Sequence, residues 1–220
     1  MTNHLHMGQL PLLATMSLPL AALVAQHTQG VDGSHDMAHI ERVVANARRL
    51  AAAESLPPAE LRLALAAAYC HDLDDAKYGG SPALARARAV LAACEEAFSP
   101  AEVERACAVI GGVSYTGERA ASLASGGGGG GPPAAPPDRL TAIVQDADRL
   151  DAIGAHGIAR CFCFGGARSR PLAESVAHFH EKLLLLRGLM KTPAGRAEAE
   201  GRHAYMEGFL AQLALEAASA

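Results

Sequence analysis

The sequence predicts an all-α protein, because its composition and its helix start and stop signals agree. Half of the 220 residues are hydrophobic, whereas aromatic residues make up 4% and tryptophan is absent. Alanine and leucine favour helices, and the β-branched and aromatic residues that fill sandwiches and barrels are scarce. This length suits one domain with additions. We therefore expect a single helical bundle over residues 18–218, preceded by a disordered stretch over residues 1–17.

The apolar segment Leu10–Ala25 resembles a signal peptide or a membrane anchor only in part. No lysine or arginine precedes it, it contains Pro11 and Pro19, and it is shorter than the ~20 residues that span a bilayer. We expect instead a first core helix over about residues 18–29. The predicted location is the cytoplasm, with organelle or secretory targeting as the alternative.

Four helices are predicted in the N-terminal half after that segment. The first two cover His39–Ala53 and Glu60–Asp72, and Ser55–Pro58 separates them. Glu60–Asp72 is rich in alanine and leucine, so this helix is expected to be buried on most sides. The third covers Pro82–Phe98, and the fourth covers Ala101–Ile110, with Ser99 as its N-cap and Gly111-Gly112 as its stop.

A glycine and proline insert over residues 126–137 interrupts the second half. Six consecutive glycines do not hold one backbone conformation, so we expect a disordered surface loop. Asp138 then caps a helix over Arg139–Ile153. Two longer helices follow over Leu172–Met190 and Ala194–Ala218.

Charge and cysteine content exclude some classes of protein. The net charge of −4 and the pI near 6.2 provide no basic surface for a nucleic-acid polymer. The cysteine number is odd and no CxxC pair occurs, which favours free thiols in a reducing compartment over a disulfide framework. The cysteines are Cys70, Cys94, Cys107, Cys161 and Cys163.

The residues with the most specific chemistry are His39, the adjacent pair His71-Asp72, and Asp146. Together they make a four-ligand nitrogen and oxygen set for a divalent metal. Imidazole suits Zn, Fe, Ni or Cu, whereas carboxylates favour Mn and Mg, so the set does not select one ion. Taken singly, His39 reads as a core histidine and Asp146 as part of a solvated acidic face. Asp146 nevertheless borders an apolar stripe, where an unpaired carboxylate would be costly and a metal would remove that cost.

The segments around these residues resemble the HD superfamily of metal-dependent phosphohydrolases. They are most similar to its small bacterial-type hydrolases, some of which are nucleotide pyrophosphohydrolases. The resemblance covers about residues 18–213 without the insert. It is carried by Ser34–Val43, Tyr69–Asp75, Gln145–Gly154, His178–Leu183, Met190–Thr192 and Gly201–His203.

The resemblance implies roles for individual residues. The metal ligands are His39, His71, Asp72 and Asp146. The catalytic candidates are Asp75, as general acid or base, and Lys77. The candidate phosphate-binding or pocket residues are Lys182, His178, Arg202, Arg149 and His35. Other readings stay open: the cations could be solvated, His35 and Asp36 could start a helix, and Asp74 and Asp75 could end one.

The histidine distribution favours a mononuclear site. No histidine lies between His71 and His156, where binuclear relatives place further ligands. The expected cofactor is one divalent ion, with Mn preferred and Mg, Co, Ni, Fe or Zn as alternatives. Such an ion lowers the pKa of bound water from ~15.7 toward about 7–9, which supplies hydroxide near neutral pH.

The predicted activity is hydrolysis of nucleoside triphosphates to monophosphate and pyrophosphate. The first alternative is a phosphomonoesterase acting on nucleoside monophosphates or small phosphate esters. The second is a non-catalytic HD module that binds a nucleotide or a partner protein. No GxxxxGK[ST] loop is present, so the nucleotide rests on the resemblance. We expect a small phosphorylated substrate, no nucleic-acid polymer and no membrane; a homodimer stays open.

Overall fold

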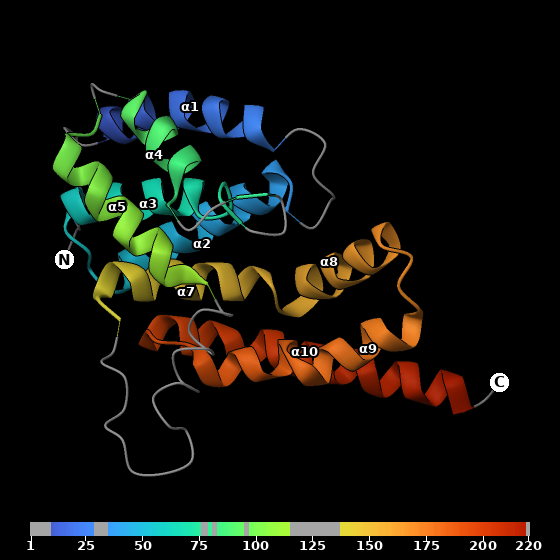
Figure 1. Cartoon of the computed structure of the whole chain (residues 1–220). Coiled ribbons are helices and arrows are strands. Elements are labelled where there is room, and N and C mark those ends of the chain that lie inside the picture. The colour runs from blue at the N-terminus through green and yellow to red at the C-terminus, as the bar shows by residue number, and fades with distance from the viewer. Residues whose placement is uncertain are drawn as a thin grey trace, which may run out of the picture.

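The computed structural model describes residues 10–28, 35–75, 79–80, 83–94, 97–114 and 137–218. All regular secondary structure in these ranges is helical, which confirms the predicted all-α class. The elements, shown in Figure 1, are α1 (Leu10–His27), α2 (Met37–Ala53), α3 (Pro58–Cys70), α4 (Ala85–Ala92), α5 (Pro100–Val113), α7 (Arg139–Asp151), α8 (Gly154–Ala167), α9 (Leu172–Glu181), the 3₁₀ helix η2 (Leu183–Leu189) and α10 (Pro193–Ala218).

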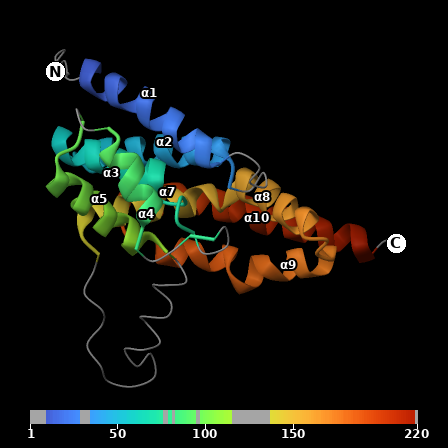
Figure 2. The ribbon, with the colours of Figure 1, turned by 45° about the horizontal axis from the view of Figure 1, so that its top comes forward.

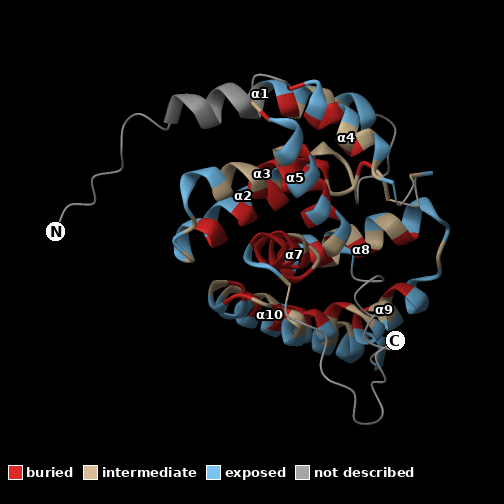
Figure 3. Ribbon diagram, turned by 60° about the vertical axis from the view of Figure 1, so that its left-hand side comes forward, coloured by how far each residue is buried: buried red, intermediate tan, exposed pale blue. Residues whose placement is uncertain are grey.

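Helix α7 lies at the centre of the molecule. It packs against α2, α3, α5, α8 and α10, and most of its residues are buried; Figure 3 views it nearly end-on, as a mostly red coil. Helices α1 to α5 gather on one side of α7, while α9, η2 and α10 lie on the other side (Figures 1 and 2). A residue of α7 can therefore contact both halves of the chain.

Helix α2 is amphipathic and starts at a conventional cap. The Asp36 side chain accepts a hydrogen bond from the backbone N–H of His39 at 3.0 Å, which satisfies one of the N–H groups left open by the first turn. Ile40, Val43 and Leu50 form a buried stripe toward the core. Asn46 joins this face to α7, because its Nδ2 donates to the carbonyl of Ala147 at 2.9 Å.

Several helix boundaries differ from the sequence expectation. Helix α1 begins at Leu10 rather than near residue 18, and the third predicted helix shortens to α4. Helix α8, which carries four glycines, was not expected. The helix expected over Leu172–Met190 divides into α9 and η2. Apart from its last residue, the glycine and proline insert lies outside the described residues.

Gly111 and Gly112 do not stop α5, which continues to Val113. The reason is close packing: a Cβ on Gly112 would lie 2.6 Å from Cγ2 of Thr141 on α7. This glycine therefore permits contact between two helices and does not end one.

Asp146 connects α7 to the start of α10. Its carboxylate is fully buried and accepts hydrogen bonds from the Lys191 backbone N–H at 2.8 Å, from the Thr192 backbone N–H at 2.7 Å and from the Thr192 hydroxyl at 2.7 Å. The Thr192 hydroxyl oxygen in turn accepts the N–H of Gly195. These donors satisfy a buried carboxylate without a metal.

Gly195 tests this junction. Its Cβ would lie 2.3 Å from an Asp146 oxygen, so Gly195→Ala is expected to destabilise the fold by about 1–3 kcal/mol. Gly201 is the control on the same helix, because nothing lies within 4 Å of its Cβ position. Gly201→Ala is expected to stabilise the protein by up to about 1 kcal/mol. Urea unfolding of both variants measures this, and equal effects would contradict the packing argument.

Two further observations concern the apolar helices and the cysteines. Within the part of the chain that the structure describes, no helix is both long enough and apolar enough to cross a membrane. All five cysteines are free thiols, as expected, and Cys163 is the exposed one.

Candidate metal centre

His39, His71 and Asp72 come together between α2 and the end of α3. One ligand atom from each lies within 4.8 Å of the other two. His39 Nε2 is 3.3 Å from Asp72 Oδ2, and His71 Nε2 is 3.3 Å from Asp72 Oδ1. Three of the four predicted ligands therefore form one cluster.

The chain places these side chains through two local features. His39 lies in the first turn of α2, on the edge of the buried stripe, and is fully buried. Helix α3 ends at Cys70, so His71 occupies its C-cap position and Asp72 follows in the turn. Because the helix ends there, adjacent residues can direct an imidazole and a carboxylate to one point.

Asp148, and not Asp146, is the carboxylate of α7 that lies near the Nε2 atoms of this cluster. Asp148 Oδ1 lies 3.7 Å from His39 Nε2 and 3.8 Å from His71 Nε2. Asp146 lies two residues earlier, on another face of the helix, where it binds the start of α10. The structure therefore does not place Asp146 with the predicted ligands, and Asp148 occupies that position.

Each histidine is held through its Nδ1 atom. His39 Nδ1 is 2.7 Å from Asp151 Oδ2, and His71 Nδ1 is 2.9 Å from the carbonyl oxygen of Ala68. Since a carboxylate and a carbonyl accept hydrogen bonds, both Nδ1 atoms are assigned as donors. Both Nε2 atoms then present lone pairs to the cluster, as metal-binding histidines do.

The polar atoms in the cluster fit a cation. His39 Nε2, His71 Nε2 and Asp72 Oδ2 are buried and make no hydrogen bond. Burial lowers the pKa of His39, but the hydrogen bond to Asp151 and the nearby Asp72 carboxylate outweigh it and hold this pKa above its ordinary value. Burial also opposes ionisation of Asp72, yet the nearby His71 and His39 hold its pKa well below the usual range. The pocket thus favours positive charge next to two nitrogens and carboxylate oxygens, a ligand set for a divalent metal.

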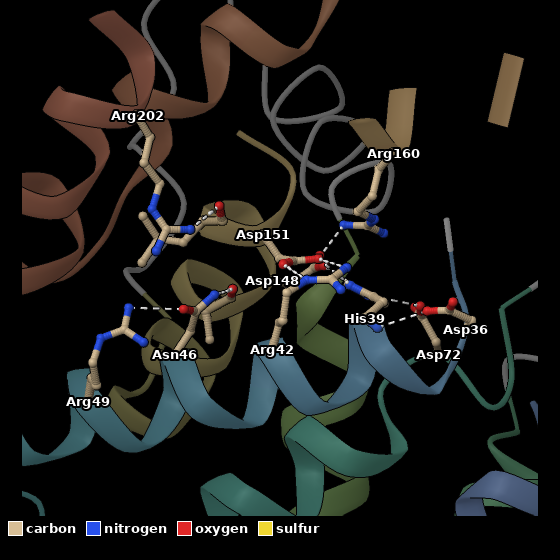
Figure 4. A network of polar contacts seen from close by, with 12 residues as sticks. Asp36, His39, Arg42, Asn46, Arg49, Asp72, Asp148, Asp151, Arg160 and Arg202 are labelled. Carbon is tan, nitrogen blue, oxygen red and sulfur yellow. Dashed lines mark hydrogen bonds and ion pairs between the residues drawn. The ribbon is translucent and has the colours of Figure 1, made fainter. Parts of the chain in front are cut away.

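Asp151 supports the cluster from the end of α7. Its buried carboxylate accepts hydrogen bonds from His39 Nδ1, from Arg42 Nε at 2.6 Å and from Arg160 Nη1 at 3.0 Å (Figure 4). Burial opposes its ionisation, but the hydrogen bonds to His39 and Arg42 hold the pKa of Asp151 well below its usual range. Sequence reasoning missed this residue. The spacing of Asp148 and Asp151, three apart on one helical face, was the available signal.

A cavity of about 320 Å³ adjoins the cluster. Two of its lining residues make the connection: the His35 ring lies 5.8 Å from the His39 ring, and Arg160 binds Asp151. The lining residues that carry or can carry positive charge are His35, Arg160, Arg170, His178 and Lys182. The cavity therefore brings together three of the predicted phosphate-binding residues, namely His35, His178 and Lys182.

The structure does not place Arg149 and Arg202 with the other predicted phosphate-binding residues. Arg149 Nη1 donates to the carbonyl of Leu189, and Arg202 Nη1 donates to the carbonyl of Leu150, each at 2.6 Å. Neither guanidinium is among the groups that line the cavity. Burial lowers the pKa of Arg202 below its ordinary value. These two arginines join α7 to η2 and α10.

Next to the catalytic candidates Asp75 and Lys77, Asp74 has a clear structural role. Its carboxylate oxygens accept the backbone N–H groups of Arg86 at 3.3 Å and Ala87 at 2.9 Å, so it caps the start of α4. Asp75 follows directly and is half-buried. Lys77 lies outside the described residues. The catalytic roles of Asp75 and Lys77 stay predictions.

Known structures resemble most of the chain, and one curated protein matches part of it in sequence. YpgQ of Bacillus subtilis (strain 168) is 53% identical over 74 residues, which cover 32% of this chain and 36% of YpgQ. The crystal structure of YpgQ in complex with ADP has a TM-score of 0.67 at 30% identity, and the match covers 89% of this chain and 97% of that one. The crystal structure of an HD-superfamily hydrolase from Bacillus thuringiensis has a TM-score of 0.68 at 30% identity, and the match covers 94% of this chain and 100% of that one.

The HD domain model matches residues 37–153, more than half of the chain. That range contains His39, His71, Asp72, Asp148 and Asp151, the residues that form and support the cluster. The chain therefore belongs to the HD-domain family and is a metal-dependent phosphohydrolase.

Proposed function

We propose that the protein hydrolyses nucleoside triphosphates to a monophosphate and pyrophosphate. The observation that carries this proposal is the cationic cavity beside the ligand cluster. Among the described residues that line it, five carry or can carry positive charge and none is acidic. A chain of phosphates is the small-molecule group that best matches such a lining.

The volume of the cavity also suits part of a nucleotide. About 320 Å³ lies at the lower end of the range for small-molecule sites. Phe164 and Leu183 add apolar surface to the lining. YpgQ, which has a similar fold, has been crystallised with ADP, and this supports a nucleotide as the ligand here.

His39, His71, Asp72 and Asp148 would hold one divalent ion, with Mn as the expected metal. When bound, this ion supplies a hydroxide near neutral pH and polarises a phosphoryl oxygen. The protein groups perform the other tasks. Asp151 fixes the His39 ring, and the cavity cations orient the phosphates and offset the charge that develops on the leaving group.

The products distinguish this activity from its alternatives. Purified protein is incubated with a panel of nucleoside tri-, di- and monophosphates in Mn, Mg, Co or Ni. The expected products are pyrophosphate and a monophosphate. Free phosphate released from monophosphates would instead indicate a phosphomonoesterase. Binding without turnover under every metal would indicate a non-catalytic module. Light scattering during the same work measures the predicted option of a homodimer.

Lys182 tests the cavity as the phosphate site. Lys182→Ala is expected to lower kcat/KM by about 10–100-fold, because a hydrogen bond to a charged group contributes about 1.5–3 kcal/mol. The control is Arg168→Ala, which removes an exposed cation that stacks on Phe164 at 4.3 Å and does not line the cavity. Steady-state kinetics should show little loss for the control. Equal losses in both variants would contradict the assigned site.

A further inference from the structure

Asp151 brings three donors from two different helices to one buried carboxylate. His39 and Arg42 come from α2, and Arg160 comes from α8. The Asp151 side chain is only 1% exposed, so its charge is balanced by these neighbours and not by water. The arrangement is visible in Figure 4, where Arg42, Arg160 and His39 all point at this carboxylate.

The donors share the same oxygen atom. Asp151 Oδ2 lies 2.7 Å from His39 Nδ1, 3.0 Å from Arg160 Nη1 and 3.1 Å from Arg42 Nη2. When one oxygen accepts several hydrogen bonds, each of these bonds is weaker than a single bond to that oxygen would be. The hydrogen bond to His39 is therefore weaker than it would be without Arg160.

The two histidines of the cluster differ in this respect. His71 donates to the neutral carbonyl of Ala68 within its own helical turn, so its ring is held locally. His39 donates to a full carboxylate from α7. A carboxylate raises the basicity of the other ring nitrogen more than a carbonyl does, and such partners typically change metal affinity by about 10–100-fold.

We propose that Asp151 is the positioning residue of the metal centre and that Arg160 competes with His39 for its carboxylate. Asp151 fixes His39 with Nε2 toward the ligand cluster and strengthens it as a ligand. Arg160 also lines the cavity, so it connects the cavity to the metal ligand through one carboxylate. This inference concerns metal binding alone and does not depend on which substrate the cavity accepts.

The test is Mn binding at fixed pH without nucleotide, measured by titration calorimetry on the full chain. Asp151→Asn is expected to weaken Mn binding by about 10–100-fold. Arg160→Gln is expected to tighten Mn binding several-fold, because His39 then has a larger share of the carboxylate and a cation near the site is lost. A purely structural role for this network predicts weaker binding in both variants.

Arg170→Gln controls for simple charge removal. Arg170 lines the same cavity and stacks on Phe164 at 5.3 Å, and no hydrogen bond joins it to Asp151. The proposal expects Arg160→Gln to tighten Mn binding more than Arg170→Gln does. Equal tightening, unchanged binding or weaker binding in Arg160→Gln would overturn the competition. Wild-type affinity in Asp151→Asn would overturn the positioning role. If Asp151→Asn does not fold, the comparison of Arg160→Gln with Arg170→Gln still tests the competition for the Asp151 carboxylate.

Discussion

Replacing His71 and Asp72 together by alanine is expected to abolish hydrolysis, with kcat/KM falling by at least about 1000-fold. The two side chains supply a nitrogen and the carboxylate oxygens around which the cluster is built. Only His39 and Asp148 would be left, which is too few ligands to hold an ion firmly. Kinetics with saturating Mn, together with calorimetry of Mn binding, measure both effects.

Asp74→Ala is the matched control for this double variant. Asp74 lies two residues after Asp72, but its carboxylate caps α4 and lies outside the cluster. Its loss should cost about 0.5–2 kcal/mol of stability and leave Mn affinity close to that of the wild type. Activity that persists in the double variant, in any of the metals, would refute the assignment of the centre.

The second large effect separates two acidic residues of one helix. Asp146→Ala is expected to destabilise the protein by about 3–5 kcal/mol, because it leaves the backbone N–H groups of Lys191 and Thr192 without their acceptor. Asp148→Ala is expected to change stability by less than about 1 kcal/mol, since Asp148 is partly exposed. It should instead weaken Mn binding by at least about 10-fold.

Urea unfolding in the presence of a chelator and Mn calorimetry distinguish these two results. Chelation removes the contribution of bound metal to stability, so that the two roles do not mix. A stable Asp146→Ala protein with lost Mn affinity would restore Asp146 as a ligand. It would also remove the argument for Asp148.

These variants test the main difference between the predicted site and the structure, namely which carboxylate of α7 serves the cluster. The resemblance carried by the segments around His39, His71 and Asp72 predicts that these residues meet, and the end of α3 directs the adjacent pair to one point. The same resemblance implies Asp146 as the fourth ligand, and its place beside an apolar stripe requires a partner for its carboxylate. It has such partners, but they are the backbone N–H groups of residues 191 and 192. A contact across that distance along the chain leaves no local pattern.

The same limit explains the differences in the fold. Helix α8 begins at Gly154 and carries four glycines, a composition that disfavours helix by about 1 kcal/mol per glycine relative to alanine. Contacts with α7, α9 and α10 stabilise it, and these are not visible in local propensity. Gly157 and Gly165 permit close packing, since a Cβ on either would lie within 2.5 Å of a neighbouring oxygen.

The metal cluster and most of the cavity wall come from different parts of the sequence, which meet near the end of α7. The residues that form the metal cluster lie within the matched segment 37–153, whereas most of the cavity wall is encoded after it, from Gly157 to Leu183. Substitutions in the later segment can therefore reshape what the protein accepts without touching a metal ligand. Arg160 is the exception, because a change there reaches the metal ligand through Asp151. On the proposed function, substitutions in the cavity wall would thus alter the preference for a substrate while the metal ligands stay unchanged.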